Sequence, residues 1–138
     1  MSMLSRRIFA ACGLCSALGL VASAVGAGAQ PVAPVGITRR TLGTIDYPGE
    51  GKHSILMSLE LAPNALIARH THPGIESSVV TEGEIELEVE GQPAKRYAAG
   101  EGFQVPPGVP HSGRNGPATS RLAITYVVEK DKPLASPA

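Results

Sequence analysis

Short segments in which apolar residues recur at every second position constrain the fold of this chain most strongly. In the segment 84–90, Ile85, Leu87 and Val89 alternate with four glutamates. Successive side chains of a strand point to opposite faces, so this pattern predicts a strand with one buried face and one acidic, solvated face. No helical period of useful length is present, and the sequence therefore predicts an all-β domain.

Eight further segments show a similar pattern, and turn residues separate them. The 16 glycines and 12 prolines of the chain supply these turns and do not indicate disorder. Many short strands at this spacing are typical of a sandwich or a barrel, and 138 residues suffice for a single such domain. The expected strands are 38–46, 53–61, 66–72, 75–81, 84–90, 94–98, 102–106, 111–115 and 120–128.

The first 29 residues have the order of charged, apolar and small residues that defines a secretory signal peptide. Arg6 and Arg7 precede an uncharged apolar stretch, and the A-x-A sequence at 27–29 makes Gln30 the expected mature N-terminus. The paired arginines favour twin-arginine export over the general secretory route. We therefore expect a periplasmic or secreted protein.

Two alternative interpretations of this leader concern the apolar segment 8–27. If it is retained, it acts as a membrane anchor, but its 20 Gly- and Ala-rich residues make insertion marginal. We expect cleavage and no stable anchor afterwards. Cys12 and Cys15 have a C-x-x-C spacing, yet they lie inside this segment, so we interpret them as part of the leader rather than as a redox or metal pair.

The charge of the mature chain argues against nucleic acid as a partner. Without Arg6 and Arg7, ten Lys and Arg face twelve Asp and Glu, a net charge of about −2. No basic stripe remains to bind a phosphate backbone. A small-molecule substrate or ligand is the expected partner.

Three of the four histidines lie in two short clusters. His70 and His72 are two residues apart on one expected strand, so their imidazoles leave the same face. A Pro-Gly turn follows, and Glu76 opens the next strand, which can return a carboxylate to the same ion. His111 follows a second Pro- and Gly-rich bend at the start of another strand.

The two clusters resemble the two conserved motifs of the cupin superfamily. The first motif, G-x5-H-x-H-x(3,4)-E-x6-G, fits residues 64–83 with its leading glycine changed to Asn64, a residue that also tolerates left-handed turns. The second, G-x5-P-x-G-x2-H-x3-N, fits residues 100–115 at every fixed position. The resemblance implies a single-domain cupin-type double-stranded β-helix, or jelly-roll barrel, at 38–130, between a linker at 30–37 and a mobile or edge-lying tail at 131–138.

The resemblance also implies one divalent transition metal in the barrel. Its ligands by position are His70, His72, Glu76 and His111. Three imidazoles and one carboxylate suit Fe, Mn, Ni, Co, Cu or Zn, and the sequence does not distinguish among them. In an octahedral ion, four protein ligands leave two positions for small molecules, which is the form of a catalytic site.

Other residues have weaker signals. His53 lies outside both motifs and is expected at the surface or an edge rather than as a fifth ligand. Tyr126 is the candidate acid or base, although packing in the barrel wall is the usual role of such a tyrosine. The same holds for Tyr97. Arg69 is expected to point away from the metal, and Arg114 and Arg121 are candidate carboxylate binders that are by default solvated. The apolar residues expected to line the barrel are Met57, Leu59, Leu66, Phe103 and Val105.

Three functions remain open from sequence. The first is a dioxygenase-like oxidoreductase that acts on an enol, catechol or flavonol-like small molecule, as in single-domain cupin dioxygenases. The second is a metal-dependent lyase or isomerase in which Tyr126 moves a proton. The third is a metal- or ligand-binding protein without turnover. Because a small open barrel has strand edges to protect, we also expect a homodimer.

Overall fold

The computed structural model describes residues 35–49 and 51–138, and this part of the chain consists of strands and turns without helix. The expected leader at 1–29, with its cysteines, and most of the expected linker lie outside the described residues. No helix that could cross a membrane occurs within the described ranges. The strands are β1 (Ile37–Tyr47), β2 (Lys52–Leu61), β3 (Leu66–Thr71), β4 (Gly74–Glu82), β5 (Glu84–Val89), β6 (Lys95–Ala98), β7 (Gly102–Val105), β8 (His111–Asn115), β9 (Ser120–Glu129) and β10 (Ser136–Pro137).

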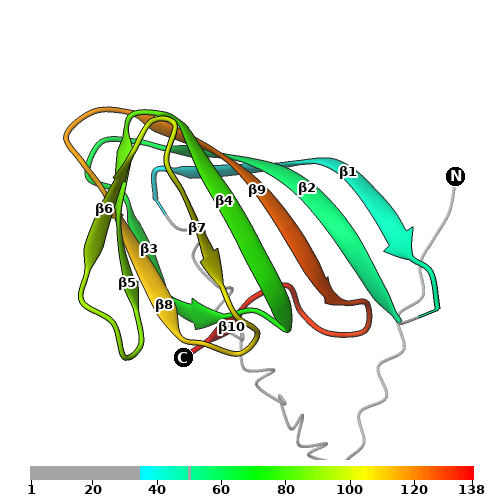
Figure 1. Ribbon diagram of the computed structural model, residues 1–138. Helices are drawn as coiled ribbons and strands as arrows, with labels where there is room; N and C mark the ends of the chain where they lie inside the picture. The colour runs from blue at the N-terminus through cyan, green and yellow to red at the C-terminus, as the bar shows by residue number, and fades with distance from the viewer. Residues whose placement is uncertain (1–34, 50) are drawn as a thin grey trace, which may run out of the picture. The chain divides into compact units, whose positions relative to one another are not determined.

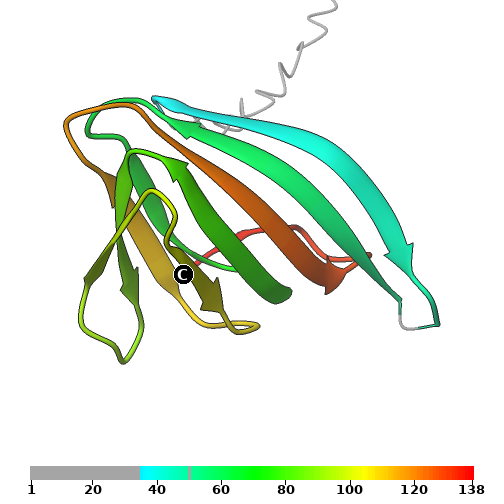
Figure 2. The same cartoon turned by 45° about the horizontal axis from the view of Figure 1, so that its top comes forward.

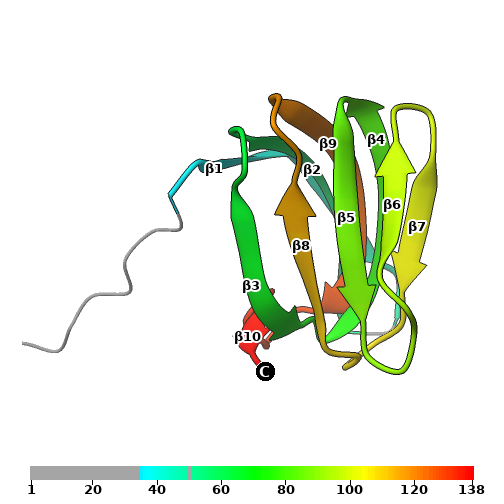
Figure 3. The same ribbon diagram turned by 90° about the vertical axis from the view of Figure 1, so that its left-hand side faces the viewer.

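The strands form two five-stranded antiparallel sheets that face each other (Figures 1 and 3). One sheet has the order β1-β2-β9-β4-β7, and the other has the order β10-β3-β8-β5-β6. Chain neighbours such as β3 and β4 therefore belong to different sheets, as in a jelly roll. All nine predicted strands are present within one residue of their expected ends, and the predicted all-β fold is confirmed.

The apolar core lies between the two sheets, where the period-two alternation directs the side chains. On β9, Leu122, Ile124, Tyr126 and Val128 are buried while the residues between them are more exposed. Met57, Leu59, Phe103 and Val105 lie in the core as expected. Leu66 does not: it is 55% exposed, because its register partner is the outward-facing Arg114 and the preceding Ala65 is buried instead.

Two asparagines of the motif regions have structural roles. Asn64 has a φ of 59°, the left-handed conformation that the replaced glycine of the first motif would adopt without strain. Asn115 is buried, and its side-chain amide nitrogen lies 2.7–3.0 Å from the carbonyl oxygens of Leu61, Ala62 and Ala118. The Asn115 amide thereby joins the end of β8 to two connecting segments.

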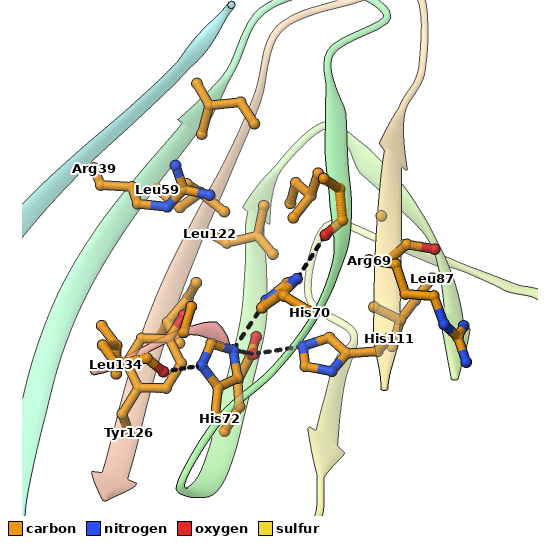
Figure 4. Close-up of a pocket in the computed structure, with 18 of the residues that line it drawn as sticks. Arg39, Leu59, Arg69, His70, His72, Leu87, His111, Leu122, Tyr126 and Leu134 are labelled. Carbon is orange, nitrogen blue, oxygen red and sulfur yellow. Dashed lines mark hydrogen bonds and ion pairs between the residues drawn. The ribbon is translucent and has the colours of Figure 1, made fainter. Parts of the chain in front are cut away.

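The C-terminal segment is edge-lying. It leaves the end of β9 and crosses to the other sheet (Figure 2), where Ser136 and Pro137 form β10 against Thr71 and His70 of β3. Residues 136 and 137 thus extend the sheet edge beside β3. This placement brings Leu134 next to the histidine cluster (Figure 4).

Replacing Asn115 by Ala should lower the free energy of unfolding by about 2 to 4 kcal/mol, because three carbonyls near the buried site lose their donor. Urea unfolding measures this change. Gln104 is the matched control, an exposed amide that donates one hydrogen bond to Ser77. Gln104→Ala should change stability by less than about 0.5 kcal/mol, and equal losses in both variants would contradict the role of Asn115.

Candidate metal centre

The four predicted ligand residues meet between the two sheets. His70 lies on β3, His72 directly after it, Glu76 on β4 of the opposite sheet, and His111 at the start of β8. One nitrogen or oxygen from each side chain lies within 4.8 Å of the others. His72, Glu76 and His111 are buried and His70 is half-buried. Figure 4 shows the three imidazole rings converging, two from β3 and the residue after it and one from β8.

Gly74 positions the carboxylate. A Cβ atom at this residue would lie 2.0 Å from the carbonyl oxygen of Val127, so only glycine lets β4 approach β9 this closely. The resulting register sets Glu76 opposite Tyr126. Gly74 therefore has two roles: it lies in the turn that reverses the chain, and it permits the close packing of β4 on β9 that sets this register.

Each imidazole is oriented by a backbone carbonyl. The Nδ1 atoms of His70, His72 and His111 lie 2.7, 2.6 and 2.9 Å from the carbonyl oxygens of Ala68, Leu134 and Val109. A carbonyl only accepts, so each Nδ1 carries the proton. In the neutral ring, each Nε2 then presents a lone pair, as a metal ligand requires.

These lone pairs point toward one another. His70 Nε2 lies 3.1 Å from His72 Nε2, and Glu76 Oε2 lies 2.9 Å from His72 Nε2 and 3.3 Å from His111 Nε2. Acceptors at such distances repel unless a proton or a cation lies among them. His111 Nε2 is also buried without a hydrogen-bond partner in the described residues.

A transition metal fits this donor set. Donor atoms bound to one ion at about 2.1 Å and at right angles lie about 3 Å apart. Three of the donor distances, at 2.9, 3.1 and 3.3 Å, are close to this value. Three imidazole nitrogens and one carboxylate oxygen suit the first-row divalent metals. His70, His72, Glu76 and His111 are therefore the residues that would hold the ion.

The charge of the site is also favourable. Burial alone would raise the pKa of the Glu76 carboxyl, but contacts with His111, His72 and Ser78 outweigh burial and lower it well below the usual range. Ser78 Oγ donates a hydrogen bond to Glu76 Oε1 at 2.7 Å, so that the other oxygen, Oε2, faces the histidines. Glu76 is thus an anion at neutral pH.

His70 and His111 differ in how readily they hold a second proton. Burial lowers the pKa of His70 and keeps it neutral. For His111, burial also favours the neutral ring, but the Glu76 carboxylate, 3.3 Å from Nε2, outweighs burial and raises the pKa. A metal ion therefore competes with a proton for the Nε2 atom of His111.

The cluster forms part of the wall of a cavity of about 380 Å³. Apolar side chains make up most of the rest, among them Met57, Leu59, Leu122 and Ile124. Tyr126 also lines the cavity, with its ring centroid 4.8 Å from that of His72. Burial, together with the charge of Glu76, raises the pKa of the Tyr126 phenol, which therefore keeps its proton.

The other histidine and tyrosine singled out in the sequence do not join the cluster. His53 pairs in register with Asp46 and Val128 at the start of β2 and is not among the four clustered residues. Tyr97 packs against Phe103, with ring centroids 5.1 Å apart, and does not line the cavity.

The predicted arginines have other partners or positions. Arg69 forms an ion pair with Glu90 and points away from the histidines (Figure 4). Arg121 pairs with Glu60 and Glu82 on the outer face, and Arg114 borders an outer depression.

Sequence reasoning missed three contributors to the site: Ser78, the Leu134 carbonyl and Arg39. Ser78 shares the inner face of β4 with Glu76, two residues away, so the alternation alone would have indicated it. The Leu134 carbonyl has no side-chain signature. Arg39 lies in a segment whose threonines and arginines hide which face is buried.

A model of the cupin domain family matches residues 57–128, which is more than half of the chain and includes all four clustered residues. The chain is a cupin. Solved structures agree with this assignment at the level of the fold. No curated protein matches the sequence.

Three solved structures illustrate the likeness. The cupin shares 27% identity with an RmlC-like cupin from Shewanella frigidimarina (TM-score 0.57, covering 70% of this chain and 79% of that one). It shares 27% with the polyketide cyclase RemF from Streptomyces resistomycificus (TM-score 0.58, 72% and 70%). It shares 19% with the DMSP lyase DddQ from Ruegeria pomeroyi (TM-score 0.64, 75% and 52%) and spans about half of that protein.

Replacing His111 by Ala should weaken metal affinity by more than about 100-fold, because a direct donor contributes more than the residues that orient it. Competition with a chromophoric chelator measures the affinity. His53→Ala, a histidine outside the cluster, should bind as the wild type does. Equal affinity in both variants would exclude His111 as a ligand.

Removal of residues 133–138 should weaken metal affinity by about 10- to 100-fold, because His72 loses the carbonyl that orients it. Leu134→Ala is the control, since it keeps the carbonyl and should stay within about threefold of the wild type. The same chelator competition applies. A folded truncated protein with unchanged affinity would show that the Leu134 carbonyl does not matter.

Proposed function

We propose that this cupin is a metal-dependent enzyme that acts on a small organic molecule in the cavity. One observation carries the proposal: three imidazole nitrogens and one carboxylate oxygen converge on the wall of a largely apolar cavity of about 380 Å³. This volume lies in the range of small-molecule sites. Four protein donors also leave room on an octahedral ion, which favours catalysis over a closed structural site.

The residues around the ion support such chemistry. Glu76 neutralises one of the two metal charges, so a positive site remains for an anionic oxygen of the substrate. The apolar side chains limit water and strengthen this attraction. When bound, the metal supplies Lewis acidity and, for a redox-active ion, electron transfer.

The first candidate reaction is oxygenation of an enol, catechol or flavonol-like substrate by a dioxygenase-like oxidoreductase. The donor set supports it, because three imidazoles and a carboxylate suit Fe, Mn, Ni and Cu as well as Zn. The apolar lining suits an aromatic or enolic body. In this reaction the protein positions the substrate and keeps competing water out.

The second candidate is a non-redox lyase, isomerase or cyclase. A specific observation favours it: Tyr126 holds a protonated phenol in the cavity beside His72 and Glu76. A phenol of raised pKa keeps its proton at neutral pH, so Tyr126 would act as a hydrogen-bond donor to the substrate rather than as a base. The similar structures include a lyase and a cyclase, which gives this candidate a parallel in other proteins.

Export and dimerisation remain proposals. The leader at 1–29 supports a periplasmic or secreted location, where no cytoplasmic cosubstrate is available. Strand β1 supports a homodimer, because it is an edge strand with ten of its eleven residues exposed. Light scattering on the mature protein tests the dimer.

One experiment distinguishes the two candidate reactions. Protein stripped of metal is reloaded with Fe, Mn, Ni, Cu or Zn and offered enols, catechols and flavonols with and without dioxygen. Oxygen uptake with the redox-active ions, lost in His111→Ala, is the expected result for the oxidoreductase. Turnover without dioxygen that persists with zinc and falls at least about 100-fold in Tyr126→Phe supports the non-redox enzyme. Tight binding with no turnover in any condition contradicts both and leaves a binding protein.

A further inference from the structure

One cation of the cavity has no acidic partner. Two arginines line the cavity, Arg39 and Arg69. Arg69 is paired with Glu90. Arg39 forms no ion pair or hydrogen bond with any described residue. It is also the sole Lys or Arg on the inner face of its sheet within the described ranges, a face otherwise dominated by apolar side chains.

Strand register shows that Arg39 faces the cavity. Arg39 pairs with Leu59 on β2, and Leu59 pairs with Leu122 on β9. Residues directly opposite in a sheet project to the same face. Because Leu59 and Leu122 both line the cavity, the Arg39 side chain extends along the same wall, and Figure 4 shows it reaching from β1 past Leu59.

The wall between Arg39 and the candidate metal centre is apolar. The row of Arg39 and Leu59 is followed along the strands by Met57 and Ile124, and then by the row that pairs Tyr126 with Glu76. Arg39 and Glu76 are thus four residues and three strands apart, roughly 19 Å across a flat sheet. Their side chains span part of this distance, so the gap suits a molecule of one or two rings.

A ligand in the cavity would lie between two positive ends, Arg39 on β1 and the ion that the four clustered residues would hold.

We propose that the cavity selects a small amphipathic carboxylate, whose oxygen donors bind at the histidine cluster while its carboxylate binds Arg39. The apolar rows between the two ends contact the body of the molecule. This inference rests on the proposed small-molecule site and names its substrate class, with Arg39 as the residue that determines specificity.

The chemistry favours a carboxylate over a phosphate. A guanidinium presents a planar pair of donors that match one carboxylate. A phosphate carries more charge and is usually bound by several cations or by a helix N-terminus. The Arg39 end of the cavity offers one cation, and the described residues contain no helix.

The neighbouring Arg40 provides a matched control. It lies on the same exposed edge strand, but it pairs with Ser58 and so faces the opposite side of the sheet. Neither Arg39→Gln nor Arg40→Gln should affect folding, since both residues are exposed and unpaired among the described residues. Both variants lose one positive charge, so their difference isolates the effect of position.

The test measures binding to zinc-loaded protein by calorimetry. The probes are catechols that carry a carboxylate on the ring (protocatechuate) or on a two-carbon arm (caffeate), each compared with its carboxamide. For at least one pair, the wild type should prefer the carboxylate by about tenfold. Arg39→Gln should abolish that preference by lowering the affinity for the carboxylate but not for the carboxamide, and Arg40→Gln should keep the preference.

Three results would overturn the proposal. They are equal affinity of the wild type for both members of each pair, equal weakening in Arg39→Gln and Arg40→Gln, and absence of binding for every probe at millimolar concentration. The readout is binding to the zinc-loaded protein, which is redox-inert. If the protein selects the carboxylates but shows no turnover, the proposed enzyme activity fails while this inference stands.

Discussion

The structure depends on the repulsion among three imidazole lone pairs and one carboxylate that are placed between two sheets. Backbone carbonyls fix the protonated nitrogen of each ring. The Nε2 atoms of His70 and His72 then lie 3.1 Å apart, and Glu76 Oε2 lies 2.9 Å from His72 Nε2 and 3.3 Å from His111 Nε2. A cation resolves this repulsion, and its binding energy becomes part of the folding energy.

The jelly-roll topology makes this arrangement possible. From β2 onward most consecutive strands lie in different sheets, so β3 and β4 carry ligand residues to opposite walls although only three residues separate His72 from Glu76. The C-terminal segment then crosses back and supplies the carbonyl that orients His72. The site is thus assembled from strands of both sheets and from the C-terminal segment.

Sequence predicted the strands and the four clustered residues because both have local signatures. Period two gives a strand its buried face, and the H-x-H spacing followed by a Pro-Gly turn brings two imidazoles and a carboxylate together. Three features had no such signature. The Leu134 carbonyl belongs to the backbone, Leu66 turns outward through register with Arg114, and Arg39 became a cavity residue only through pairing with Leu59. Each depends on contacts between strands, which one-dimensional patterns do not specify.

The central claim is that His70, His72, Glu76 and His111 bind one metal ion. The most direct test is the metal content, by mass spectrometry, of mature protein purified from the extracytoplasmic fraction of its own host without chelators. We expect about one equivalent of a divalent transition metal, which is lost in His111→Ala. Folded wild-type protein that contains no metal and takes none up would contradict it.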